Sequence, residues 1–225
     1  MQTVPFSPDQ ASSFAGEVDA LYGFLWALTI VVGTLISLSI LYFAVKYRRR
    51  NEEEIPRPVR ASHRLEAVWV GVPFVVAMGI FVWSAGIYYR MYRPPDEAID
   101  VYVVAKQWMW KFQHLDGHRE INELHVPVGR KVKLTMTTED VIHSFFVPAL
   151  RFKQDTLPGM AIKIHFTANK EGKYEIPCAE LCGSLHYNMK SNMLVIPSDE
   201  FDQLTAMSEE KFKEQLGALL ERYPY

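Results

Sequence analysis

Two long stretches without a charged residue dominate the first half of this 225-residue chain. They cover residues 21–45 and 67–89. Each is long enough to cross the hydrocarbon core of a bilayer as a helix, which takes about 20 apolar residues. A helix buried in a soluble protein would satisfy the same criterion, but two such stretches in one short chain favour a transmembrane hairpin. We therefore predict an integral membrane protein with two spans.

The segments that flank these stretches indicate how the chain is oriented. The connecting loop is basic, with a run over residues 46–50 followed by Arg57, Arg60 and Arg64. Because lysine and arginine concentrate in cytoplasmic loops, we expect this loop to face the cytoplasm or matrix and both termini to lie on the opposite side. Residues 1–20 contain no lysine or arginine, so they lack the basic start of a cleaved signal peptide. They also lack the features of a transit peptide, which favours a bacterial plasma membrane over a mitochondrial inner membrane, although a chain encoded in the organelle would lack these features too.

Pro94 and Pro95 end the second stretch, because proline cannot continue a helix and restricts the residue before it. We place a domain boundary here, with the N-terminal segment and hairpin in residues 1–95 and a second domain in residues 96–197. That domain contains short runs rich in β-branched and aromatic residues, separated by turns with glycine: 99–105, 132–136, 161–166, 173–176 and 192–196. Several short strands at this spacing predict an all-β sandwich or barrel. Apolar residues at helical spacing predict a C-terminal helical tail over residues 198–225.

A short loop over residues 177–189 contains both cysteines of the chain, Cys178 and Cys182. It also contains a histidine and a methionine, and a further histidine lies upstream beside an apolar run: His186, Met189 and His143. Thiolate, imidazole and thioether groups are soft ligands that favour copper. A blue copper site uses a single cysteine, so the second thiolate indicates two copper ions bridged by two sulfurs. A Cys178–Cys182 disulfide is the alternative, but it would leave the histidines and the methionine unexplained.

The pattern Cys178-x-Glu180-x-Cys182-x3-His186-x2-Met189, with His143 upstream, resembles the dinuclear copper (CuA) site of cytochrome c oxidase subunit II. The resemblance covers most of the chain and implies an α+β membrane protein. A two-helix transmembrane hairpin would precede an all-β cupredoxin-like Greek-key barrel on the extracytoplasmic side, with a short C-terminal helix. The implied function is to receive electrons from cytochrome c and pass them to the haem of subunit I, where oxygen is reduced to water and protons are pumped. Subunit I, with its haem and copper B, and subunit III are the expected partners.

The same resemblance implies a role for each residue of the loop. The two cysteines would bridge both copper ions, and His143 and His186 would each bind one of them. Met189 would be a weak axial ligand, and the backbone carbonyl of Glu180 would complete the second copper. The Glu180 carboxylate would bind a magnesium ion shared with subunit I, in keeping with the preference of magnesium for oxygen ligands.

An aromatic segment also matches the family. The run Gln107-Trp108-Met109-Trp110-Lys111-Phe112 resembles the segment beside the copper centre, which implies that Trp108 receives electrons from cytochrome c. Family members more often have tyrosine at the position of Met109 and histidine at that of Lys106. An alternating strand would place Trp108, Trp110 and Phe112 on one face, where a stripe of core residues is the simplest role for them.

Glu66 opens the second apolar stretch. With Trp69 and Pro73 it resembles the start of the family's second span, where this glutamate lies at the mouth of a proton pathway into subunit I. Carboxylates at membrane depth are often functional, but this one lies at the rim. The alternative is an interfacial acid stabilised by the positive end of a helix dipole.

The remaining features weigh against other classes of protein. A formal net charge of −2 gives no support for nucleic-acid binding, which usually shows a basic face. No Cys-x-x-Cys-His motif is present, so we expect no haem on this chain. Four other histidines match no motif position and are expected to be surface or core residues: His114, His118, His125 and His165. The rival functions are a quinol oxidase subunit II, which would lack the copper ligands, a membrane-tethered copper carrier, and the cupredoxin electrode of a nitrogen-oxide reductase.

Overall fold

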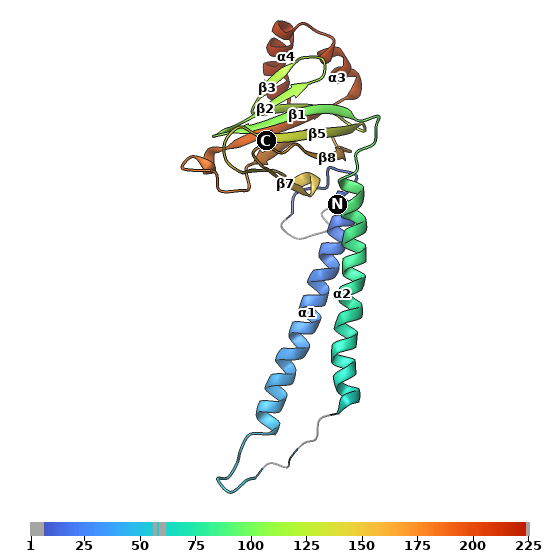
Figure 1. The fold of residues 1–225 in the computed structure, drawn as a ribbon, viewed down its shortest axis with the longest axis vertical. Coiled ribbons are helices and arrows are strands. Elements are labelled where there is room, and N and C mark those ends of the chain that lie inside the picture. Colours follow the sequence, from blue (N-terminus) through green and yellow to red (C-terminus); the bar gives the residue numbers. More distant parts are fainter. Residues whose placement is uncertain (1–6, 56–57, 59–61, 224–225) are drawn as a thin grey trace. The chain divides into compact units, whose positions relative to one another are not determined.

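The computed structural model describes residues 7–55, 58 and 62–223, and Figure 1 shows the course of the chain. The chain divides into two compact units. One unit is Asp19–Gly86, and the other combines the described residues of Met1–Val18 with those of Ile87–Tyr225. Arg57 and Arg60 of the predicted basic loop lie outside the described residues.

Two long helices, α1 (Ala15–Lys46) and α2 (His63–Met91), contain the two predicted apolar stretches. By length and composition, both helices are able to cross a membrane. Their apolar side chains point outward, since Leu41 is 62% exposed and Phe74 is 64% exposed. A surface of this kind would be unfavourable in water. A helix suits lipid because its backbone N–H and C=O groups are paired within the segment.

The β domain contains a five-stranded sheet in the order β3-β2-β1-β5-β8. Its strands are β1 (Ile99–Lys106), β2 (Met109–His114), β3 (Arg119–Ile121), β5 (Lys131–Thr138) and β8 (Ile162–Thr167). Inward and outward residues alternate along β1, β2 and β5, as expected when one face of a sheet covers a core. β1 and β5 run parallel, whereas the other neighbouring strands are antiparallel.

A second sheet, β4-β10-β9, and a hairpin of β6 and β7 complete the strands of this domain. They are β4 (Glu123–Pro127), β6 (His143–Val147), β7 (Phe152–Thr156), β9 (Gly172–Pro177) and β10 (Lys190–Ile196). Aromatic rings link β2 to β6, because Phe145 packs edge-to-face on Trp110 with ring centroids 5.1 Å apart. Both rings are fully buried. This packing fixes the position of β6, which begins at His143.

The N-terminal residues pack on the β domain. The Ser12 hydroxyl donates a hydrogen bond to the carbonyl of Leu150 at 2.8 Å, and Ser12 also forms an isolated antiparallel bridge with Ala168. The sequence prediction grouped residues 1–95 together, whereas the described residues 7–18 share a compact unit with the strands.

Two C-terminal helices, α3 (Ser198–Thr205) and α4 (Glu209–Arg222), follow β10. The helical tail is thus two helices with a short break between them. Their apolar residues form one buried cluster with the end of β10: Leu194, Ile196, Phe201, Leu204, Phe212, Leu216 and Leu219. The predicted fold class is confirmed, since two long apolar helices precede a β domain that ends in short helices.

Candidate metal centre

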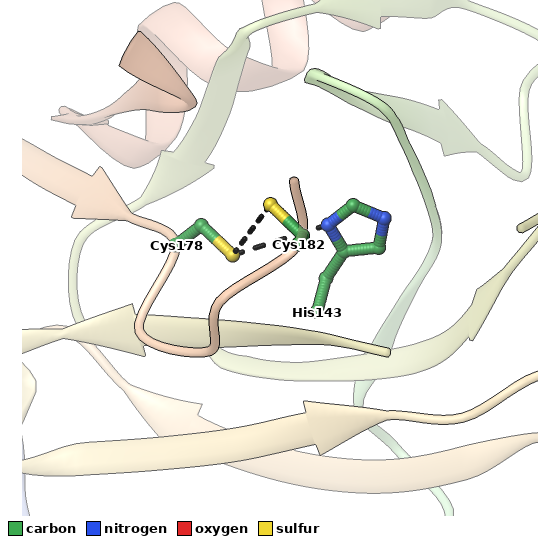
Figure 2. Close-up of side chains that lie close together, drawn as sticks. All are labelled: His143, Cys178 and Cys182. Atoms are coloured by element: carbon green, nitrogen blue, oxygen red, sulfur yellow. Dashed lines mark hydrogen bonds between the residues drawn. The ribbon is translucent and has the colours of Figure 1, made fainter. Parts of the chain in front are cut away.

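Three buried side chains from two parts of the chain meet at the start of β6, as Figure 2 shows: His143, Cys178 and Cys182. One donor atom from each lies within 4.8 Å of the others. The two Sγ atoms are 3.9 Å apart, and Cys178 Sγ also lies 3.9 Å from His143 Nδ1. Among the described residues, this is the one group of at least three His, Cys, Asp or Glu donors spaced closely enough to hold a metal ion.

Backbone hydrogen bonds close the ligand loop, which we define as residues 178–189. The N–H of Cys178 donates to the carbonyl of Met189 at 3.0 Å, and the N–H of Ala179 donates to the carbonyl of Ser144 at 3.0 Å. The first bond joins the two ends of the loop, and the second attaches the loop to β6. Together they bring the cysteines beside a histidine that is distant in the sequence.

The other predicted ligands surround the two sulfurs. His186 lies on a short 3-10 turn and places Nδ1 3.4 Å from Cys182 Sγ. Met189 is only 1% exposed, and its Sδ lies 3.7 Å from the same sulfur. The carbonyl oxygen of Glu180 lies 3.3 Å from Cys178 Sγ, and Glu180 itself is exposed. The structure therefore brings all the predicted copper donors into contact with a cysteine sulfur.

The two thiols influence each other. Burial, together with the neighbouring Cys178, raises the pKa of the Cys182 thiol to about 12. In the metal-free protein this thiol therefore stays protonated at neutral pH. Coordination to a metal ion removes the proton from a thiol, so metal binding here is expected to release protons and to weaken as the pH falls.

Asp140 is a residue of this site that the sequence analysis missed. Its carboxylate lies 2.8 Å from His143 Nε2 and accepts hydrogen bonds from the backbone N–H groups of Gln107 and Val141 at 2.7 Å each. Partial burial raises the pKa of Asp140, but these hydrogen bonds outweigh it and lower the pKa to about 2. An ionised carboxylate behind a histidine fixes the ring and its tautomer, here with Nδ1 toward Cys178. In the sequence, the only sign of this role was an acidic residue three positions before His143, the predicted ligand.

Trp108 lies against the ligand loop. It belongs to the turn between β1 and β2, where Nε2 of the preceding Gln107 donates a hydrogen bond to the carbonyl of Cys182 at 2.8 Å. The indole ring is so close to Gly183 that a Cβ atom on this glycine would lie 3.3 Å from it. Gly183 also has a φ of +121°, which favours glycine. The half-buried Trp108 thus connects the domain surface to the loop that carries both cysteines.

The alternative role of a three-residue aromatic core stripe does not hold for its first member, Trp108. The strand β2 begins at Met109, so the alternation applies only from there onward. Trp110 and Phe112 point into the core and are almost fully buried. Trp108 precedes the strand and is free to lie on the ligand loop instead.

The remaining candidates are not members of the metal group. Glu66 is in the first turn of α2, where its side chain is 58% exposed and Oε2 lies 3.3 Å from Nδ1 of His63. The four histidines that match no motif are all buried: His114, His118, His125 and His165. Two of them hold the buried Glu120, with distances of 2.8 Å from His114 and 2.7 Å from His125. Burial raises the pKa of Glu120, but the two histidines outweigh it and lower the pKa overall.

Comparison with known proteins agrees with this geometry. The family model described as cytochrome C oxidase subunit II, periplasmic domain, matches residues 88–196. Cytochrome c oxidase subunit 2 of Thermostichus vulcanus is 29% identical, over 87% of this chain and 76% of that protein. Cytochrome c oxidase subunit 2 of Alkalihalophilus pseudofirmus is 32% identical, over 78% of this chain and 55% of that protein.

A solved structure supports the same conclusion. The periplasmic domain of subunit II of cytochrome oxidase (CoxB) of Bradyrhizobium japonicum superposes with a TM-score of 0.50 at 28% sequence identity. The match covers 53% of this chain and 99% of that one. The two apolar helices and the match to a periplasmic domain indicate a membrane protein with an extracytoplasmic domain. The fold, the ligand loop and these relatives together show that the chain belongs to the cytochrome c oxidase subunit II family.

Proposed function

We propose that this chain is the subunit of a respiratory haem-copper oxidase that accepts electrons from cytochrome c. The observation that carries the proposal is the pair of buried cysteine sulfurs 3.9 Å apart, with two imidazoles, a thioether and a backbone carbonyl around them. This set of donors fits a dinuclear CuA centre better than a site with one thiolate. Bound there, the two copper ions would accept and release one electron at a time.

The protein supplies a site that changes little during electron transfer. The ligand loop is closed by backbone hydrogen bonds, and Met189 and Cys182 are almost fully buried. Asp140 holds the ring of His143 from behind. Fixed ligands and the exclusion of water keep the reorganisation that accompanies each transfer small.

Two residues define the route of the electron. Trp108, half-buried and in contact with the ligand loop, would receive it from cytochrome c. His186, also half-buried, would pass it toward the haem of subunit I. Reduction of oxygen to water, and the proton pumping coupled to it, would take place in subunit I, and this chain would carry no haem of its own.

Glu180 would serve two metal ions. Its carbonyl oxygen faces Cys178 Sγ at 3.3 Å, whereas the residue as a whole is exposed. The exposed carboxylate is available to a magnesium ion shared with subunit I, which would supply the remaining ligands. Glu66, an exposed acid at the first turn of a membrane helix, would lie at the mouth of a proton pathway in the same partner.

The proposed location is a bacterial plasma membrane. The basic loop between α1 and α2 would face the cytoplasm, and both termini and the β domain would lie outside. Subunit I, with its haem and copper B, would be the main partner, with subunit III beside it.

The test uses the intact oxidase purified from membranes. We expect two copper ions per chain beyond those of subunit I, and an electron paramagnetic resonance spectrum in which one unpaired electron couples equally to both. Cys182→Ser should abolish that pattern, whereas Ser184→Ala, an exposed neighbour in the same loop, should preserve it. A single copper with a blue-site spectrum would contradict the proposal and favour a tethered copper carrier.

A further inference from the structure

The outward face of the five-stranded sheet is strongly basic. Alternation along the strands points one set of side chains away from the core, and the strand register places them in adjacent rows. Six of these side chains are cationic, and we call them together the basic face: Lys106, Lys111, Arg119, Lys131, Lys133 and Lys163. Almost all the other outward residues of these strands are uncharged.

Nearby acids neutralise only part of this charge. Asp100 lies 2.7 Å from Lys133, and a single carboxylate, Glu139, is shared by Lys106 at 3.2 Å and Lys111 at 2.8 Å. Three members of the basic face have no carboxylate within ion-pair distance among the described residues: Arg119, Lys131 and Lys163. Glu209 of α4 lies near Arg119 but pairs with Lys213 at 2.8 Å. The face therefore keeps a clear positive excess on a chain whose net charge is −2.

The centre of the basic face is apolar. Tyr102 is 45% exposed and Ile121 is 64% exposed, and Val104 follows Tyr102 on the same side of β1, in the row that leads through Lys111 to Ile121. These residues line a shallow groove of about 360 Å³, which Lys111 and Arg119 also border. An apolar centre with a charged rim is the usual composition of a protein-binding surface.

This face ends beside the proposed electron route. Lys106 and Met109 pair across the end of β1 and β2, and the turn between them is Gln107–Trp108. Trp108 in turn lies on Gly183 of the ligand loop. A protein seated on the basic face would thus lie next to the residue through which electrons enter.

We propose that the basic face docks the electron donor, and that this donor is an acidic electron-transfer protein rather than a basic cytochrome. The inference rests on the proposed function and specifies its partner. Opposite charge steers diffusing partners together and raises association rates by about 10- to 1,000-fold at low salt. A basic donor would instead be repelled at this face.

The experiment compares two forms of one donor on the intact oxidase. A basic cytochrome c is used either native or with its lysines succinylated, which makes it acidic. At low salt, we expect the succinylated form to reduce the metal centre about tenfold faster in stopped flow, and its rate to fall as salt is added. Sedimentation with the oxidised donor, which cannot transfer electrons, measures docking alone and should show the same preference.

Charge-reversal variants locate the surface. The double variant Arg119→Glu with Lys163→Glu changes two cations that flank Tyr102 in one row, and it should remove the preference for the succinylated donor. Replacement of the same two residues by glutamine should give an intermediate rate. Lys211→Glu, an exposed cation on α4, is the matched control and should leave the preference unchanged.

A faster reaction with the native basic donor, or a preference that survives both charge reversals, would overturn the inference. Reduction by a small uncharged reductant distinguishes this failure from failure of the proposed function, because it needs the metal centre but no docking surface. Binding of the oxidase to vesicles that contain anionic phospholipid is measured as well. If the double variant loses vesicle binding but reacts normally with both donors, the basic face is a lipid surface and the proposal is wrong.

Discussion

Asp140 shows how a single carboxylate can connect two parts of a site that are separate in the sequence. It lies 2.8 Å from the ring of His143 and accepts the N–H of Gln107, the neighbour of Trp108. It therefore orients a proposed metal ligand and the turn that carries the proposed electron acceptor at the same time. Its pKa of about 2 means that it is fully ionised at neutral pH, when both hydrogen bonds are strongest.

Asp140→Asn should loosen the site without unfolding it. The amide keeps the shape of the side chain but loses the charge and one acceptor, and loss of such a partner typically costs about 10- to 100-fold in metal affinity or activity. Copper titration of the detergent-solubilised chain and the hyperfine pattern of the loaded centre would measure the effect. Glu139→Gln changes the adjacent exposed acid and should leave both readouts as in the wild type. Unchanged affinity and spectrum in Asp140→Asn would show that the carboxylate does not orient His143.

Gly183→Ala should move the ligand loop away from Trp108. A Cβ atom here would lie 2.9 Å from Gln107 Nε2 and 3.3 Å from the indole, at a φ of +121°. We expect slower reduction of the centre by the protein donor and an altered spectrum. Gly117→Ala is the matched control, since its φ is +99° but nothing lies within 4 Å of the added atom. If the two variants behaved alike, backbone conformation alone would explain the effect, and the contact with Trp108 would have no role.

At the scale of elements, the sequence predicted what depends on local pattern. The ligand loop, the two apolar helices and the helical tail all follow from spacing or composition within a short window. Asp140 and Glu120 could not be predicted this way, because their partners come from other strands. The break between α3 and α4 was also missed, since the apolar stripe continues through it. Trp108 illustrates the limit, because the strand begins one residue after it and the alternation does not extend to it.

The helices α3 and α4 are held by one buried cluster, so a cavity there should release the end of the chain. Phe212 is 2% exposed and its ring lies 4.4 Å from that of His118. Truncation of a buried phenylalanine to alanine costs about 3–5 kcal/mol. For Phe212→Ala we expect faster hydrogen exchange in α4, while the spectrum of the metal centre stays unchanged. In the control variant Lys211→Ala, which changes the exposed neighbour of Phe212, the amides of α4 should exchange at the wild-type rate. Equal protection of α4 in the two variants would contradict this packing.

At the scale of the whole molecule, the structure divides into two units of different character. One carries apolar side chains on its surface, and the other has a core filled by aromatic rings. Their different surfaces are explained if lipid surrounds the first and water surrounds the second. This arrangement predicts a membrane topology that can be measured directly.

Single cysteines at exposed positions would report the topology. Asn51→Cys, between the helices, should react with a membrane-impermeant maleimide only in inverted vesicles. Leu115→Cys, in the β domain and 68% exposed, should react only from the outer side of intact cells. The two buried native cysteines provide the background in the unmutated chain. Labelling of both positions from the same side would contradict the hairpin.

The hydrogen bond between Ser12 and Leu150 links residues 138 positions apart, and this distance has a consequence for how the chain is made. The ribosome completes residues 7–18 long before it completes the strands on which they pack. With the β domain outside the membrane, this segment would be carried across the bilayer first and would wait there without its partner. A chain whose first helix inserted backwards would keep the segment on the wrong side, and the outer domain would lack the piece that covers Ala168. Completion of that domain would thus depend on correct insertion of the first helix.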